Sequence, residues 1–298
     1  MSGRVAVNYV WQHLFGRGLV PTPEDFGRHG EPPTHPELLD WLADRFAREG
    51  WSRKSLVRLI VTSATYRQSS HHRPELADVD PENTLWARQE RFRVEAEVVR
   101  DLALAASGLL ERRIGGPSVQ PPLPAGLMQL ETLKTERFME TSSGADRYRR
   151  GLYTNVQRTL VNPMLQTFDA GDPNAVCTRR DRSNTPLQAL TLLNDPVFVE
   201  CARALGLRVL EECNEVDRRA RIECMFRLCL GRSPDEYELV DLEALVELQA
   251  RLLSRDPELA AKMIGDAPLP SGNDAVEASV WIGLARTLLN LDEFITRE

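Results

Sequence analysis

Apolar residues recur along most of the chain at intervals of three and four residues, the spacing of one face of an α-helix. Glycines at positions 16, 50 and 115 stop three of these runs, as expected at helix ends. The pattern predicts helices over residues 5–14, 38–46, 56–64, 94–109, 198–209, 222–229, 237–252 and 276–291. We therefore expect a mainly α-helical, multi-helix globular domain whose apolar stripes turn toward a core. One of these stripes consists of Tyr237, Val240, Ala244, Leu248 and Leu252.

Helix starts are marked by hydroxyl and acidic residues placed just before the apolar runs. Thr34 with Glu37, Thr185 with Gln188, and Ser233 with Glu236 have the spacing of a capping box, in which two side chains bond reciprocally to backbone N–H groups. Aspartate precedes proline at 195–196 and 256–257, which predicts an N-cap followed by proline in the first turn.

The middle of the chain departs from the helical pattern. Residues 115–150 are rich in proline, glycine and serine, and residues 151–159 alternate like a short strand. We therefore expect a single domain over 1–298 with two lobes and a small β element in the middle. The predicted parts are an N-terminal helical lobe (1–112), a loop-rich joint with a short strand (113–160) and a C-terminal helical lobe (161–298).

Composition and charge narrow the function classes. The 298 residues are 42% hydrophobic and 27% charged, which is typical of a soluble globular protein. The net charge of −7 argues against nucleic acid as a partner, because phosphate backbones favour basic surfaces. We find no run approaching the ~18 apolar residues of a membrane span and no signal peptide, so the sequence leaves the compartment open.

The five cysteines and the absence of common catalytic motifs narrow the possible cofactors and metals. The cysteines stand at 177, 201, 213, 224 and 229, an odd number without C-x-x-C spacing, which predicts neither a disulfide framework nor a zinc site. Cys201, Cys224 and Cys229 lie on apolar stripes and are expected to pack as small hydrophobic residues. Nucleophile-elbow, Walker A, dinucleotide, zincin and c-type haem motifs do not occur, so no cofactor and no metal are expected on this chain.

The first polar cluster lies in the loop between the first two predicted helices. Imidazoles and carboxylates there could perform acid–base chemistry, with His13, Asp25, His29 and His35 as candidates. A metal held by His29, Glu31 and His35 is a weaker alternative. The competing interpretation is structural, with the carboxylates complementing helix N-termini.

The second polar cluster spans residues 168–194 and begins with Asp169. Side chains around the start of the predicted helix at Pro186 could hold an anion, since exposed amides and arginine forks favour one there. The candidates are Arg179, Arg180, Arg182, Asn184, Gln188 and Asn194. The alternative is an internal Asp–Arg network that ties the loop to the helix.

Several ordered segments resemble one known family. They include VNYVWQHLFGRGLV (7–20), TPEDFG (22–27), HPELLDWLA (35–43), LIVTSATYRQS (59–69), NTPLQAL (184–190) and LGRSP (230–234). Together they resemble the DUF1553 family, also called the planctomycete PSD1 domain, over nearly the whole chain from Val5 to Phe294.

The resemblance implies a domain of uncharacterised activity. Similar domains usually end larger exported bacterial proteins that carry cytochrome-c-like and DUF1549 domains upstream, which are the implied partners. It also places Asp169 and Cys177 inside recognisable segments, but transfers no catalytic residue. The leading hypothesis is an accessory or substrate-engaging module. The alternatives are a hydrolase-type enzyme with a polar site between the lobes, and a protein-interaction scaffold exposing an apolar patch.

Overall fold

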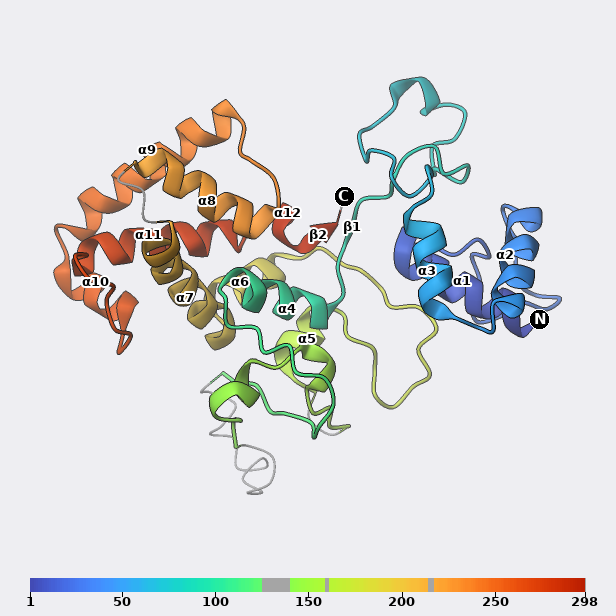
Figure 1. The fold of residues 1–298 in the computed structure, drawn as a ribbon, viewed down its shortest axis with the longest axis horizontal. Coiled ribbons are helices and arrows are strands. Elements are labelled where there is room, and N and C mark those ends of the chain that lie inside the picture. Colours follow the sequence, from blue (N-terminus) through green and yellow to red (C-terminus); the bar gives the residue numbers. More distant parts are fainter. Residues whose placement is uncertain (125–139, 159–160, 214–216, 298) are drawn as a thin grey trace. The chain divides into compact units, whose positions relative to one another are not determined.

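The computed structural model is built almost entirely of helices (Figure 1). It describes residues 1–124, 140–158, 161–213 and 217–297. Twelve α-helices occur in these ranges, and two short strands, β1 (Phe92–Arg93) and β2 (Thr296–Arg297), pair in a single small sheet. The predicted mainly α-helical fold is therefore confirmed. Of the helices in the described ranges, not one combines the length and apolar character needed to span a membrane.

Contacts divide the chain into two compact units. Unit 1 comprises Met1–Phe92, Val176–Arg180 and Thr296–Glu298. Its helices are α1 (Ser2–Phe15), α2 (Pro36–Arg48), α3 (Arg53–Val61) and the 3-10 turn η1 (Pro74–Leu76). The three α-helices pack on one another around an aromatic core in which Trp11 stacks on Phe15, with ring centroids 4.2 Å apart. Trp86 meets both rings edge-on.

Unit 2 comprises Arg93–Ala175 and Asp181–Ile295. Its α-helices are α4 (Ala96–Ala106), α5 (Pro163–Thr167), α6 (Pro186–Asn194), α7 (Pro196–Glu212), α8 (Arg218–Leu230), α9 (Glu236–Leu253), α10 (Pro257–Ile264), α11 (Ala275–Leu288) and α12 (Asp292–Ile295). The 3-10 helices η4 (Gly144–Tyr148) and η5 (Gly151–Tyr153) lie in the same unit.

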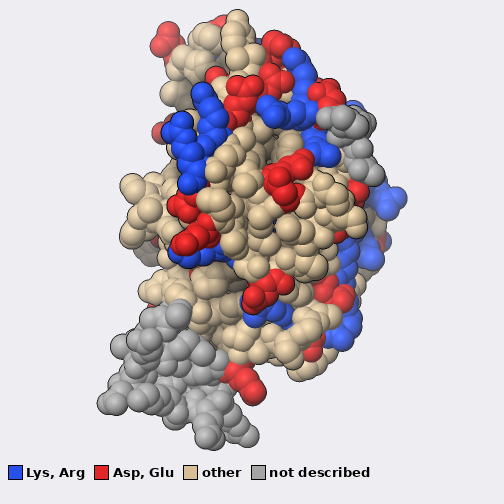
Figure 2. All heavy atoms as spheres, turned by 90° about the vertical axis from the view of Figure 1, so that its left-hand side faces the viewer, with Lys and Arg blue, Asp and Glu red and all other residues tan. Residues whose placement is uncertain are grey.

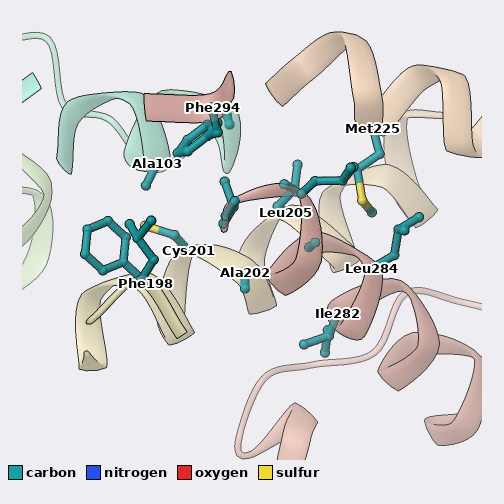
Figure 3. Packing of buried hydrophobic residues seen from close by; sticks show 14 of the residues in the cluster. Ala103, Phe198, Cys201, Ala202, Leu205, Met225, Ile282, Leu284 and Phe294 are labelled. Carbon is teal, nitrogen blue, oxygen red and sulfur yellow. The ribbon is translucent and has the colours of Figure 1, made fainter. Parts of the chain in front are cut away.

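Helix α11 is the buried centre of unit 2, and α7 packs along it (Figure 3). The two backbones approach closely at Gly206, where an added Cβ would lie 2.7 Å from the Ile282 nitrogen. Glycine is required there because a side chain would separate the helices. Leu205 from α7 and Met225 from α8 complete this part of the core.

The predicted lobe boundaries remain a prediction, and the units group the chain somewhat differently. Helix α4, which the sequence assigned to the N-terminal lobe, lies in unit 2. The predicted strand over 151–159 was wrong in its described part: residues 151–153 form η5, and only Thr154 pairs, with Val119. Gly151 lies against α4, where a Cβ would be 2.7 Å from the Glu97 carbonyl oxygen, and this close packing favours the turn.

The helix caps agree with the sequence at three of five positions. Thr185 and Gln188 form the expected capping box, and Asp195 and Asp256 cap α7 and α10. The box at Thr34 was wrong, because its hydroxyl donates to the Leu19 carbonyl and His35 takes the N-cap position. The box predicted at Ser233 forms two residues later, between Asp235 and Glu238.

The prediction that the apolar stripe over residues 237–252 faces the core was wrong for helix α9. The stripe lies in solvent, with Tyr237 86% and Leu248 46% exposed. The buried residues of α9 are instead Leu239, Val246 and Leu253, which follow a seven-residue repeat on the other side. Both sides of this helix carry apolar residues, so periodicity alone could not choose between them.

Two of the five cysteines form a disulfide, which the sequence did not predict. Cys213 at the end of α7 is disulfide-bonded to Cys224 in α8, with their Cα atoms 6.6 Å apart. The interpretation of Cys224 as a free hydrophobic residue was therefore wrong. Cys201 and Cys229 do pack as free thiols, and burial raises the pKa of each to about 12. Neither is available as a thiolate near neutral pH.

Removing this disulfide is expected to lower the free energy of unfolding by about 3 kcal/mol, because the bond closes an 11-residue separation in the unfolded chain. The test compares urea unfolding of the Cys213→Ser/Cys224→Ser variant with that of Cys177→Ser, whose exposed thiol is unbonded. Thiol titration of the denatured protein should find three free thiols; five would contradict the pairing.

Candidate functional site

A polar site of unit 2 is built around Asp169, two residues after the end of α5. Asp169 has a left-handed backbone (φ +58°), a conformation that aspartate and asparagine tolerate better than most residues. Its Oδ2 accepts three hydrogen bonds: from Arg93 Nη2 at 2.6 Å, from the Ser183 amide at 2.8 Å and from the Ser183 hydroxyl at 2.7 Å. One carboxylate oxygen therefore links Arg93, 76 positions away, to Ser183 in the loop that precedes α6.

Arg93 is buried, and its guanidinium donates hydrogen bonds to groups within this site. Its Nε donates to the Ser183 carbonyl at 2.9 Å, and its Nη2 also reaches the Phe168 carbonyl at 3.1 Å. The guanidinium lies over the Phe168 ring, 5.5 Å from the centroid. Such a buried cation requires its carboxylate partner, since desolvation would otherwise be uncompensated.

Gln188 connects the site to helix α6. Its Nε2 donates to the Thr167 carbonyl at 2.9 Å and to the Ser183 hydroxyl at 3.0 Å, while its Oε1 accepts from the Thr185 amide. The same side chain therefore caps α6 and orients it. We call the group of Arg93, Phe168, Asp169, Ser183 and Gln188 the Asp169 node.

The electrostatics of the node favour the ionised carboxylate. Burial by itself would raise the pKa of Asp169, but hydrogen bonds from the Ser183 amide and hydroxyl, together with Arg93, outweigh it and hold the pKa below its ordinary value. The Ser183 hydroxyl already donates its proton to Asp169. In this state the node fixes the positions of Arg93, Ser183 and Asp169 relative to one another.

Two of the six proposed anion-binding side chains, Asn184 and Asn194, are engaged elsewhere in the protein. Asn184 Nδ2 donates to Asp292 Oδ1 at 3.1 Å, and Asn194 Nδ2 donates to the Leu190 carbonyl at 2.8 Å. The structure brings Gln188 together with Asp169 through Ser183, and the arginine that pairs with Asp169 is Arg93, which the sequence did not single out. Arg179 and Arg180 fall in unit 1, whereas Arg182 and the three amides fall in unit 2. The anion site itself remains a prediction.

The acid–base candidates all lie in unit 1. His13 is in the last turn of α1, His29 is exposed in the loop, and His35 Nδ1 lies 3.0 Å from the Thr34 hydroxyl. Asp25 Oδ1 accepts from the Gly27 amide at 2.6 Å, which closes a local turn. Within the described ranges, His29, Glu31 and His35 do not form a metal-binding group, nor do any other three His, Cys, Asp or Glu side chains.

Sequence reasoning missed the arginines that organise unit 2. Arg93 was not connected to Asp169, because the two lie 76 positions apart and no local pattern joins them. Arg100 and Arg149 were also missed, although they are only 1% and 0% exposed. The available signal at position 100 was that Ala96, Ala103 and Leu104, three and four positions away, place this arginine on an apolar side of the helix.

These two arginines connect residues 115–117 and 147–149 to α4. Arg100 donates to the carbonyls of Arg149 at 2.5 Å and Arg147 at 2.8 Å. Arg149 in turn donates to the carbonyls of Gly115 and Pro117, and its guanidinium stacks 3.8 Å from the Tyr153 ring centroid. Buried cations thus hold the described residues on either side of this irregular stretch, around Gly115 and Arg149.

A groove runs along the exposed side of α6, next to the Asp169 node. It has a volume of about 310 Å³. Its lining is mostly apolar and comprises Pro124, Pro163, Met164, Thr167, Leu187, Leu190, Thr191, Asn194 and Asp195. Leu187 is 67% and Leu190 53% exposed, and we call this surface the α6 groove. Its chemistry suits an apolar ligand whose ends meet the amide and hydroxyl groups.

This chain is similar to a family of known proteins. No curated protein matches the chain, and neither does any solved structure. The sequence profile of PSD1, described as a protein of unknown function (DUF1553), matches residues 1–246. The match spans well over half of the 298 residues and includes the Asp169 node and the α6 groove. The chain therefore belongs to the PSD1 (DUF1553) family.

Proposed function

We propose that this chain is a non-catalytic accessory module that engages a partner domain through the α6 groove. The observation that carries the proposal is the exposure of Leu187 and Leu190 on a helix whose other side is fixed by the Asp169 node. Solvent-exposed leucines beside a groove favour the binding of an apolar surface, since burying each contributes about 1.5–3 kcal/mol.

The orientation of α6 supports this use of its leucines. Gln188 and Leu192 lie on the buried side, and Gln188 is held by three hydrogen bonds. Because positions three and four apart share a helix face, Leu187, Leu190 and Thr191 point together away from that side. The node thus presents the groove as a rigid surface, which lowers the entropic cost of binding.

The partner in this proposal is an apolar segment of another domain in a longer, exported bacterial protein. Family resemblance supplies the candidates, a DUF1549 domain and a cytochrome-c-like domain upstream. The haem would belong to the partner, because this chain lacks the C-x-x-C-H attachment motif.

The experiment measures binding of those two domains, produced from a longer relative, to this chain by calorimetry. The Leu187→Asp/Leu190→Asp variant should bind about tenfold or more weakly, because both side chains are exposed and the fold should persist. Val79→Asp, at a 72% exposed position in unit 1, is the matched control. Equal affinity of wild type and groove variant would reject the proposal.

The hydrolase-type alternative makes a different prediction. It assigns base or ligand roles to His13, His29 or His35 and anion binding to Arg180 or Arg182. Turnover of a polysaccharide or ester by the purified chain alone, abolished in His35→Ala or Arg182→Ala without a loss of melting temperature, would replace the accessory role.

A further inference from the structure

The polar end of the α6 groove carries a carboxylate. Asp195 is the charged residue among the nine that line the groove, and it is 8% exposed. Its Oδ1 accepts from the Val197 amide at 2.9 Å and so caps α7. Its Oδ2 accepts no hydrogen bond from any residue that the structure describes. One oxygen of a nearly buried carboxylate is therefore left for a ligand of the groove.

Ion pairs compensate other carboxylates of unit 2. Glu200 in α7 lies 2.9 Å from Arg147, and Glu236 in α9 lies 2.5 Å from Arg219. Figure 2 shows acidic and basic groups next to one another on the side of the molecule that lies to the left in Figure 1. Asp195, by contrast, forms no ion pair within the described ranges of the chain, so its charge is open to a cation from a ligand.

Arg100 is the described cation that acts on Asp195 through space. Its guanidinium nitrogens donate to the carbonyls of Arg149 and Arg147 and do not bond to the carboxylate. Burial raises the pKa of Asp195, because the charged carboxylate is poorly solvated there, and the Val197 amide and Arg100 offset only part of this effect. A cation bound in the groove would replace the missing solvation.

The other polar side chains of the groove already use hydrogen-bond donors within their own helices. Thr167, Thr191 and Asn194 each donate to the backbone carbonyl four positions earlier, at 2.8 Å. Both hydroxyl oxygens and the Asn194 Oδ1 remain as acceptors. Pro124 and Pro163 have no N–H to offer. The lining therefore presents mainly acceptors, which suits a ligand that brings N–H donors.

This end of the groove is also the C-terminal end of α6. Thr191 and Asn194 lie in the last turn of the helix and Asp195 follows it, so the helix dipole adds partial negative charge there. Arg286 of α11 donates to the Leu193 carbonyl at 2.9 Å, but it does not line the groove. The N-terminus of α7 begins at the same residue and offsets about half of one negative charge. The balance remains negative, which favours a cation.

From these groups we infer that the α6 groove selects a partner segment whose apolar side chains cover Leu187 and Leu190 and whose lysine or arginine binds Asp195. The inference rests on the proposed function and adds the chemistry of the partner. An ammonium or guanidinium group supplies both a positive charge and several N–H donors. A wholly apolar segment would cover the Asp195 carboxylate without giving it a partner, which is costly.

Calorimetry with the DUF1549 and cytochrome-c-like domains tests this inference. Asp195→Asn should weaken binding about tenfold, because it removes the charge, whereas asparagine caps a helix as well as aspartate does. Asp256→Asn is the matched control and should leave the affinity unchanged, since Asp256 caps α10 before a proline in the same way and does not line the groove. Raising the salt concentration from about 0.1 M to about 0.5 M should weaken the binding of wild type more than that of Asp195→Asn.

A second variant separates this inference from the proposed function. Leu187→Ser/Leu190→Ser removes the exposed apolar side chains without adding charge. If it weakens binding while Asp195→Asn binds like wild type, the groove is the binding surface and the inferred cation is overturned. If neither domain binds, or if neither variant changes the affinity, the proposed function and this inference both fail.

Discussion

Replacing Asp169 by asparagine is expected to lower the free energy of unfolding by about 3 kcal/mol at neutral pH, because the buried Arg93 guanidinium loses its counter-charge. Asparagine keeps the shape of the side chain and tolerates the left-handed backbone at this position. The substitution therefore isolates the charge from the conformation. Urea unfolding measures the change.

The pH dependence of the free energy of unfolding provides the control for this substitution. Since the pKa of Asp169 is lowered on folding, its contribution is complete above the ordinary aspartate pKa and is lost as the pH falls through the lower folded value. Wild type and Asp169→Asn should therefore converge in stability in acid. A difference that stays constant down to low pH would show that the carboxylate charge is not what holds the node together.

Replacing Arg100 by leucine should lower the free energy of unfolding by about 2–4 kcal/mol, because two buried or half-buried carbonyls lose their donor. Arg100 makes these bonds with two different nitrogens, so lysine cannot restore both. The leucine side chain also leaves part of the guanidinium volume empty. Unfolding monitored by circular dichroism measures the change.

The region that loses protection from hydrogen exchange distinguishes the loss of the Arg100 hydrogen bonds from a general destabilisation of the fold. Hydrogen exchange should accelerate first in residues 147–154, which Arg100 ties to α4 through the carbonyls of Arg147 and Arg149. The control is Arg112→Leu, an exposed arginine on the same segment, which should change the stability by less than about 0.5 kcal/mol. Equal effects of the two substitutions would refute a structural role for burial of Arg100.

The two networks assign different tasks to arginine in one chain. Arg93 neutralises a carboxylate and joins three segments, whereas Arg100 and Arg149 bind backbone carbonyls that lack regular secondary structure. Both solve the same physical difficulty, because irregular segments leave polar backbone groups that must be paired when buried. In the described part of the 113–160 region, Arg100 and Arg149 supply such donors.

Local patterns along the sequence were sufficient to predict most of the helices of this protein, although not the short α5 and α12. Apolar spacing and the caps at Thr185, Asp195 and Asp256 depend on residues within one or two turns, so a single sequence carries them. The family resemblance likewise rests on contiguous segments and is confirmed for residues 1–246. Asp169 and Gln188 could be selected because they lie close together in one polar segment.

Only the tertiary structure decided which contacts those elements make. The pairing of Arg93 with Asp169, the Cys213–Cys224 bond and the exposed side of α9 all depend on how distant helices pack. A helix with apolar residues on two sides satisfies the periodicity with either side buried. Which side of α9 is buried depends on the volume and shape of the neighbouring helices α8 and α11. The local sequence of α9 does not encode these properties.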